Sequence, residues 1–162
     1  MKWIKLTALF VTVLTLSASL TSCERDADKK RILEYSKLGI PMTGAQEAPA
    51  STSPALGTMD VVYRRDTRTL SYTVRYSGLS GAPIGVNIFG LAPTGYASAT
   101  VVQTILAASN PTLFPSTGTY TGFLFADGTT VKEADLLNGV YYMNIRTAAF
   151  PAGEIRGQIR FQ

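Results

Sequence analysis

The sequence contains no histidine and a single cysteine, Cys23, among its 162 residues. A Ser-His-Asp triad and every Cys/His zinc pattern are therefore excluded, and one cysteine cannot form an intrachain disulfide. The sequence also has no run of five or more Lys and Arg residues and no Gly-rich phosphate loop of the GxGxxG or GK[ST] type. Among acid–base chemistries, these absences leave only paired carboxylates.

The net charge gives little support for nucleic-acid binding. The formal charge is +4 at pH 7, but Lys2 and Lys5 belong to an N-terminal segment that we expect to be removed. The remaining basic and acidic residues are near balance. We therefore expect no nucleic-acid partner.

The first 23 residues, MKWIKLTALFVTVLTLSASLTSC, have the parts of a secretory signal: lysines, an apolar run from Leu6 to Leu20, and small residues. That run of 15 residues is short for a helix that spans a bilayer, which needs about 20 residues. The tetrad LTSC resembles the bacterial lipobox, which implies that Cys23 is lipidated and becomes the first residue of the mature chain. An ordinary cleaved signal with a free Cys23 is the alternative.

The segment ERDADKKR, residues 24–31, is charged and has no aromatic or β-branched residue, which is typical of a solvated tether. We thus divide the chain into a signal peptide (1–22), a lipidated cysteine with a flexible charged tether (23–34) and one folded domain (35–162). This organisation predicts a protein of the cell envelope. The lipid on Cys23 would hold it on a membrane, the outer membrane, with the domain facing the periplasm or the cell surface.

The composition and the spacing of apolar residues favour an all-β fold. The chain has 14 glycines, 8 prolines and 8 tyrosines, and Thr and Val are frequent. The segment TLSYTVRYSGL, residues 69–79, places Leu70, Tyr72, Val74 and Tyr76 on one face of a strand. About eight such strands predict an antiparallel two-sheet sandwich, Greek-key or immunoglobulin-like, with barrel-like closure as a variant.

One stretch, GTTVKEADLLNG, departs from this alternation. Thr130, followed three residues later by Glu133, has the spacing of a capping box, and Asn138-Gly139 is a natural C-terminal stop. The pattern predicts one short helix near 130–138.

The C-terminal segment NIRTAAFPAGEIRGQIRFQ carries the most prominent polar residues. Residues i and i+2 share a face of a strand, so Glu154 and Arg156 would lie side by side. In a hairpin they would face Asn144 or Arg146 of the partner strand, and Glu47 could join them from the first loop. Such a cluster is either a patch that recognises a partner or a structural network that sets the hairpin register. The sequence leaves both interpretations open.

Four segments of the domain resemble the CHRD domain, a repeat first described in chordin and found in bacterial secreted proteins. They are TGAQEAPASTSPALGTMDVVY (43–63), TLSYTVRYSGL (69–79), IFGLAPTG (88–95) and LLNGVYYMNIRTAAFPAGEIRGQI (136–159). The resemblance implies a domain that acts by binding outside the cell, as the chordin relatives bind proteins.

Three positions depart from the family pattern. Relatives commonly have histidine where this chain has Asn87, Phe89 and Arg146. An amide, a phenyl ring and a guanidinium do not replace imidazole as a metal ligand. No metal site is therefore carried over, and we expect no cofactor.

The leading interpretation is a membrane-anchored envelope lipoprotein with a non-catalytic CHRD-like binding or scaffolding domain. Its partner would be an envelope or extracellular protein or a glycan. One alternative is an envelope enzyme that acts on glycans through two carboxylates about 5–10 Å apart. Another is a metal-binding domain, as suspected for relatives that have the histidines. The spacing of the carboxylates does not favour an enzyme, so no catalytic residue is assigned.

Overall fold

Eight antiparallel strands form one sheet in the computed structural model, which describes residues 32–106 and 115–162. The strand order is β5-β4-β7-β8-β1-β2-β3-β6. The strands are β1 (Glu34–Thr43), β2 (Leu56–Arg64), β3 (Thr69–Ser77), β4 (Pro83–Phe89), β5 (Val101–Leu106), β6 (Gly118–Phe125), β7 (Tyr141–Thr147) and β8 (Ile155–Ile159). A 3₁₀ turn, η1 (Gly44–Gln46), follows β1, and helix α3 (Glu133–Leu137) precedes β7.

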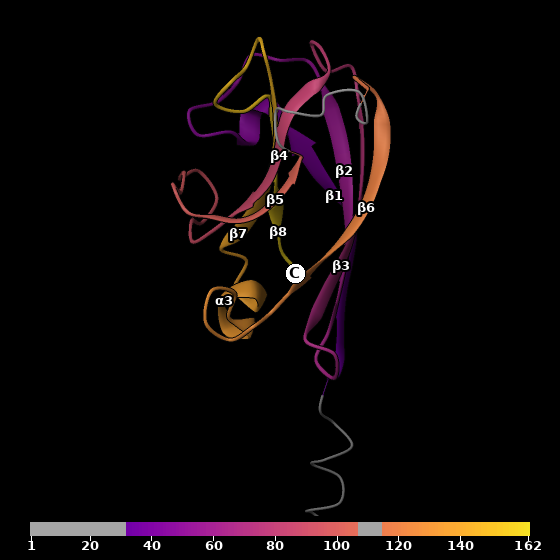
Figure 1. Cartoon of the computed structure of the whole chain (residues 1–162), viewed down its shortest axis with the longest axis vertical. Helices are drawn as coiled ribbons and strands as arrows, with labels where there is room; N and C mark the ends of the chain where they lie inside the picture. The colour runs from indigo at the N-terminus through magenta and orange to yellow at the C-terminus, as the bar shows by residue number, and fades with distance from the viewer. Residues whose placement is uncertain (1–31, 107–114) are drawn as a thin grey trace, which may run out of the picture. The chain divides into compact units, whose positions relative to one another are not determined.

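The sheet curls around its core, so that β4, β5, β7 and β8 lie opposite β1, β2, β3 and β6 (Figure 1). The two halves belong to one sheet because β1 pairs with β8 at Thr43 and Arg156. The all-β antiparallel fold is thus confirmed, and it takes the nearly closed, barrel-like form rather than that of two separate sheets.

The inner face of β3 carries the residues that the alternation predicts, and Tyr63 of β2 lies beside them. Tyr63, Leu70, Tyr72, Val74 and Tyr76 are all buried in the hydrophobic core. Burial of these large side chains supplies much of the apolar area that stabilises the sheet.

A side chain rather than a backbone ladder connects the two edge strands, β5 and β6. The Nε2 of Gln103 donates to the carbonyl of Phe123 at 2.8 Å, and its Oε1 accepts from the Tyr72 hydroxyl at 3.0 Å. Tyr72 reaches this point across Gly122, where a Cβ atom would lie 2.6 Å from the Tyr72 oxygen. The missing side chain of Gly122 therefore permits the link that brings the sheet close to closure.

Helix α3 lies within the predicted interval, but its N-terminus is not a capping box. Its N-cap is Lys132, which makes no side-chain cap hydrogen bond. Glu133 instead forms a 2.6 Å ion pair with Arg65 and accepts from the Tyr63 hydroxyl at 2.9 Å. The predicted capping box was wrong because a tertiary ion pair engages the glutamate. The C-terminal stop is as predicted, since Gly139 has a φ of +71° and its N–H donates to Leu136.

Residues Glu34–Gln162 form one compact unit. The predicted signal peptide (1–22), Cys23 and most of the predicted tether lie outside the described residues. Within the described part of the chain, no helix has the length and apolarity needed to cross a bilayer.

Candidate functional site

The predicted polar residues gather on the outer face of β4, β7 and β8. The register places Asn87, Asn144 and Arg156 side by side on these three strands. They face outward but are covered by loops, so that Asn87 and Asn144 are each 3% exposed and Arg156 is 1% exposed. The hydrogen bonds of this cluster run to the loop after β1 and to the loop after β4.

Arg156 is a buried cation that is held by carbonyl oxygens. Its Nη1 donates to the carbonyl of Tyr96 at 2.7 Å, and its Nη2 donates to Gln158 at 2.8 Å. Its Cζ lies 3.5 Å from the centroid of the Tyr142 ring, which is a close cation–π contact. Burial lowers the pKa of Arg156, while Tyr142 and Glu47 oppose this shift. The guanidinium therefore fixes the loop after β4 onto the sheet.

Gln158 and Tyr142 attach the same loop at two further points. The Nε2 of Gln158 donates to the carbonyl of Ala92 at 2.9 Å and to that of Gly139 at 2.7 Å. The Tyr142 hydroxyl accepts from the backbone N–H of Ser98 at 3.1 Å. Arg156 and Gln158, two residues apart on β8, and Tyr142 on β7 thus hold the same loop.

Glu154 is fully buried and accepts hydrogen bonds from three segments. Its Oε1 accepts from the Ser53 hydroxyl at 2.7 Å and from the Ser80 N–H at 2.8 Å. Its Oε2 accepts from the hydroxyls of Ser80 and Thr147. Burial alone would raise the pKa of Glu154, but these hydrogen bonds outweigh it and lower the pKa. Glu154 and Arg156 share a face but turn to different loops and form no ion pair with each other.

Glu47 joins the cluster through Asn144. The Nδ2 of Asn144 donates to both Glu47 oxygens, at 2.8 and 3.0 Å. Burial raises the pKa of Glu47 to about 7, although the Asn144 hydrogen bond and the charge of Arg156 act in the opposite direction. A Cβ atom at Gly153 would lie 2.3 Å from the Asn144 Nδ2, so a glycine is required beside this pair.

We expect the free energy of unfolding to fall as the pH rises from about 4.5 to about 7, because of Glu47. The folded protein retains a proton on Glu47 that the unfolded chain releases above its ordinary pKa of 4.5. The stabilising contribution is therefore complete below that pH and is lost as the pH rises through the folded pKa. The chain has no histidine, the side chain that normally titrates in this range.

Urea denaturation at several pH values would measure this dependence in the wild type and in Glu47→Gln. The substitution should flatten the dependence, whereas Glu34→Gln, on the exposed end of β1, should leave it unchanged. A Glu47→Gln curve as steep as that of the wild type would assign the dependence to another group.

Three polar atoms in or beside this cluster are buried and have no hydrogen-bond partner among the described residues. They are Asn87 Oδ1, Asn144 Oδ1 and Arg146 Nε. The Arg146 guanidinium lies across Gly85, where a Cβ atom would be 2.5 Å from its Nη2. Arg146 is thus on the shared face but outside the hydrogen-bond network of Glu154 and Arg156.

The three positions at which the family resemblance implies histidine share this face. Asn87 lies opposite Asn144, and Arg146 is two residues further along β7. Phe89 stacks on Tyr142, with ring centroids 5.3 Å apart and planes at 13°. Across residues 32–106 and 115–162, no group of three or more Asp, Glu, Cys or His side chains could hold a metal ion.

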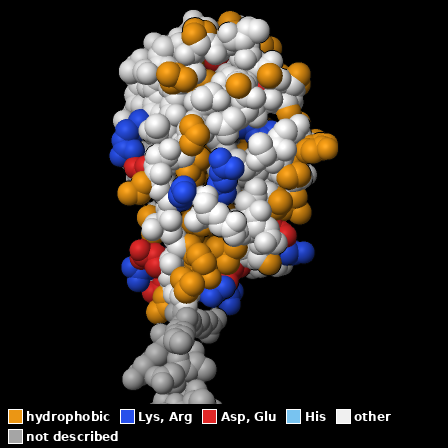
Figure 2. Space-filling model, turned by 180° about the vertical axis from the view of Figure 1, so that it is seen from behind, with side chains coloured by type: hydrophobic (Ala, Val, Ile, Leu, Met, Phe, Trp, Pro, Cys, Tyr) orange, Lys and Arg blue, Asp and Glu red, His pale blue; other side chains and the backbone are white. Residues whose placement is uncertain are grey.

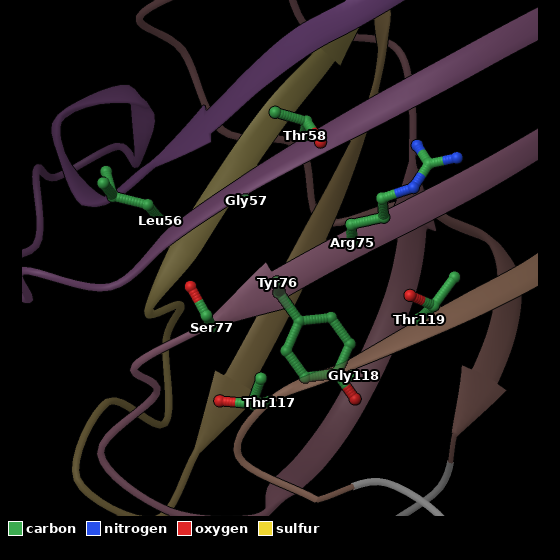
Figure 3. A pocket seen from close by; sticks show the side chains of 9 residues that line it. All are labelled: Leu56, Gly57, Thr58, Arg75, Tyr76, Ser77, Thr117, Gly118 and Thr119. Carbon is green, nitrogen blue, oxygen red and sulfur yellow. The ribbon is translucent and has the colours of Figure 1, made fainter.

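The surface formed by the described residues has at least two hollows. The first, of about 410 Å³, crosses the outer face of β2, β3 and β6. On the inner face of β3, the ring of Tyr76 is directed toward Gly118 (Figure 3). The second, of about 520 Å³, lies between the end of α3, the loop after β4 and the end of β8. No Asp or Glu lines either of these two hollows.

The lining of the first hollow combines apolar and hydroxyl groups with a guanidinium. It consists of Leu56, Gly57, Thr58, Arg75, Tyr76, Ser77, Thr117, Gly118 and Thr119. Arg75 also forms a 2.6 Å ion pair with Asp60 on the neighbouring strand.

The family model of the CHRD domain matches residues 38–159, which reach from within β1 to the end of β8. The chain belongs to the CHRD domain family. No curated protein and no solved structure matches the chain. CHRD domains are a family of a non-catalytic type, which agrees with a binding module.

Sequence reasoning missed several residues that complete the polar cluster of this CHRD domain. Gln158 could have been found, because it lies two residues after Arg156 on the same face of a strand. Ser53 and Ser80 carried no such signal, since they lie in loops 101 and 74 residues away from Glu154 along the chain.

Proposed function

We propose that this protein is a lipid-anchored component of the cell envelope whose CHRD domain is a non-catalytic binding or scaffolding module. The observation that carries the proposal is that the buried charged groups of the domain bind other parts of the same chain. Glu154 is saturated by serine and threonine donors, and Arg156 is bound to carbonyls and an aromatic ring. Charged groups bound in this way stabilise loops and are not available to react with a substrate.

The partner that we propose is a protein or a glycan of the envelope or the extracellular space. The first hollow suits such a contact because the hydroxyls of Thr58, Ser77 and Thr119 line it beside Arg75. Hydroxyl and guanidinium groups at an accessible surface can bond to backbone amides or to sugar hydroxyls. A glycosidase would need two carboxylates beside a hollow. No observation favours that alternative.

The anchor is tested by mass spectrometry of the mature protein and by fractionation of cells that express the wild type or Cys23→Ser. We expect a mature chain that begins at an acylated Cys23, because the LTSC tetrad directs lipidation. Cys23→Ser should leave the membrane fraction. An unmodified Cys23, or a Cys23→Ser protein that still partitions with membranes, would reject the anchor.

The same two strains test the binding role by crosslinking in intact cells and pull-down. A partner should be captured with the wild type and be reduced with Cys23→Ser, because the anchor positions the module. Equal capture in the two strains would show that the domain binds its partner without the lipid anchor. Turnover of a glycan by the purified protein would contradict a non-catalytic module.

A further inference from the structure

Two phenylalanine side chains are exposed on the edge strand β6. Phe123 is 66% exposed and Phe125 is 52% exposed, while Leu124 between them faces the core. Proteins usually avoid neighbouring large apolar side chains on an exposed sheet edge, because such edges promote association. The pair therefore indicates a surface that is covered in the working protein.

The strand register places these rings at the end of the sheet where the chain enters the domain. Phe125 pairs with Thr69, Thr69 with Arg64, and Arg64 with Glu34, the first residue of β1. We call this row, Glu34–Arg64–Thr69–Phe125, the entry end. The start of β1 and the turn from β2 to β3 lie at the bottom of the domain in Figure 1. Three strand spacings of about 4.8 Å separate Glu34 from Phe125 by roughly 14 Å. Phe123 lies two rows further in, beside Ser71.

Basic residues stand at the same end. Arg64 and Arg65 form ion pairs with carboxylates, but Arg68, at the exposed turn between β2 and β3, forms none with the described residues. On the face shown in Figure 2, hydrophobic side chains gather near the lower end of the domain with charged side chains beside them. Apolar rings next to an uncompensated cation fit the boundary between acyl chains and lipid phosphates.

The length of the preceding chain allows this end to reach a bilayer. Ten residues lie between Cys23 and Glu34, so a fully extended tether of eleven Cα–Cα steps would span at most about 40 Å. We propose that the entry end, with Phe123, Phe125 and Arg68, rests on the phospholipid headgroups of the membrane that holds the lipid of Cys23. This inference rests on the proposed lipid anchor.

The test uses the mature lipidated protein in vesicles of phosphatidylethanolamine and phosphatidylglycerol. Acylation consumes the thiol of the only cysteine, so one introduced cysteine can carry an environment-sensitive fluorophore. Ser71→Cys places the fluorophore beside Phe123, and Ser77→Cys places it on the same face at the far end of β3. These two positions are about 20 Å apart along the strand.

We expect a blue shift, and quenching by a lipid-bound quencher, at position 71 but not at position 77. Phe123→Ser with Phe125→Ser should abolish both effects while the protein still floats with the vesicles. Equal, water-like emission at both positions in a floating protein would overturn the docking surface and leave the anchor intact. A blue shift without quenching would also overturn it, in favour of contact with a second copy. A protein purified from cells without acylation would instead reject the anchor.

Discussion

Arg156→Ala is expected to lower the free energy of unfolding by about 3–5 kcal/mol. Arg156 is among the largest fully buried side chains, so its removal leaves a cavity. The carbonyl of Tyr96 and the Oε1 of Gln158 would lose their donors, and the Tyr142 ring would lose its cation. A buried acceptor without a donor is costly because it has also lost its water.

Urea or guanidinium denaturation at constant pH would measure this loss. Arg156→Lys should be intermediate, because it keeps the charge but loses the planar fork that serves Tyr96 and Gln158 together. Arg160→Ala is the matched surface control and should change stability by no more than about 0.5 kcal/mol. If Arg156→Ala were as stable as Arg160→Ala, the loop after β4 would be held mainly by other contacts.

Hydrogen exchange separates this loop from the rest of the domain. The N–H of Ala92, which donates to the Val140 carbonyl, and that of Ser98, which donates to the Tyr142 hydroxyl, should exchange faster in Arg156→Ala. The ladder of β2 and β3 should change only by the global loss of stability, because Arg156 makes none of its contacts there.

Glu154→Ala is expected to cost a similar amount, about 3 kcal/mol or more. The substitution would remove the acceptor from Ser53, Ser80 and Thr147 in a site closed to solvent. The carboxylate connects the loop after β1, the segment after β3 and the end of β7. Its loss should therefore weaken three segments at once.

The pH dependence of Glu154 has the opposite sign to that of Glu47. Because hydrogen bonds lower the pKa of Glu154, its stabilising contribution is present above the ordinary value of 4.5 and is lost as the pH falls through the folded pKa. Glu154→Gln should reduce the loss of stability in acid. It should not change the dependence of stability on pH between 5 and 7, which we assign to Glu47. Acid denaturation that is unchanged in Glu154→Gln would show that other carboxylates control it.

Strands with clean alternation of apolar and polar residues could be predicted from the sequence, because this alternation depends only on the local backbone. In β3, apolar residues recur at every second position, and the period of a strand is set by the backbone alone. The stop at Gly139 is equally local, since glycine adopts a positive φ at little cost. β1 shows no such alternation, because its register shifts between Lys37 and Ile40, and no pattern in the sequence predicted it as a strand.

The polar cluster could be predicted only in part from the sequence. The i, i+2 rule placed Glu154 and Arg156 on one face, and the hairpin placed Asn144 opposite Arg156. The rule could not say that the two charges turn to different loops. That depends on where Ser53, Ser80 and the carbonyl of Tyr96 come to lie, which is a property of the folded chain.

By itself, the sequence determined the all-β class, the family and the residues that face the core, because these depend on periodicity and on contiguous motifs. Tertiary structure decided that the strands form a single, nearly closed sheet, through the pairing of Thr43 with Arg156 and the link made by Gln103. Periodicity specifies which way a side chain points but not which distant strand lies beside it. For the same reason, the sequence alone did not show that Phe123 and Phe125 lie near the start of β1. The register of β1, β2, β3 and β6 shows it.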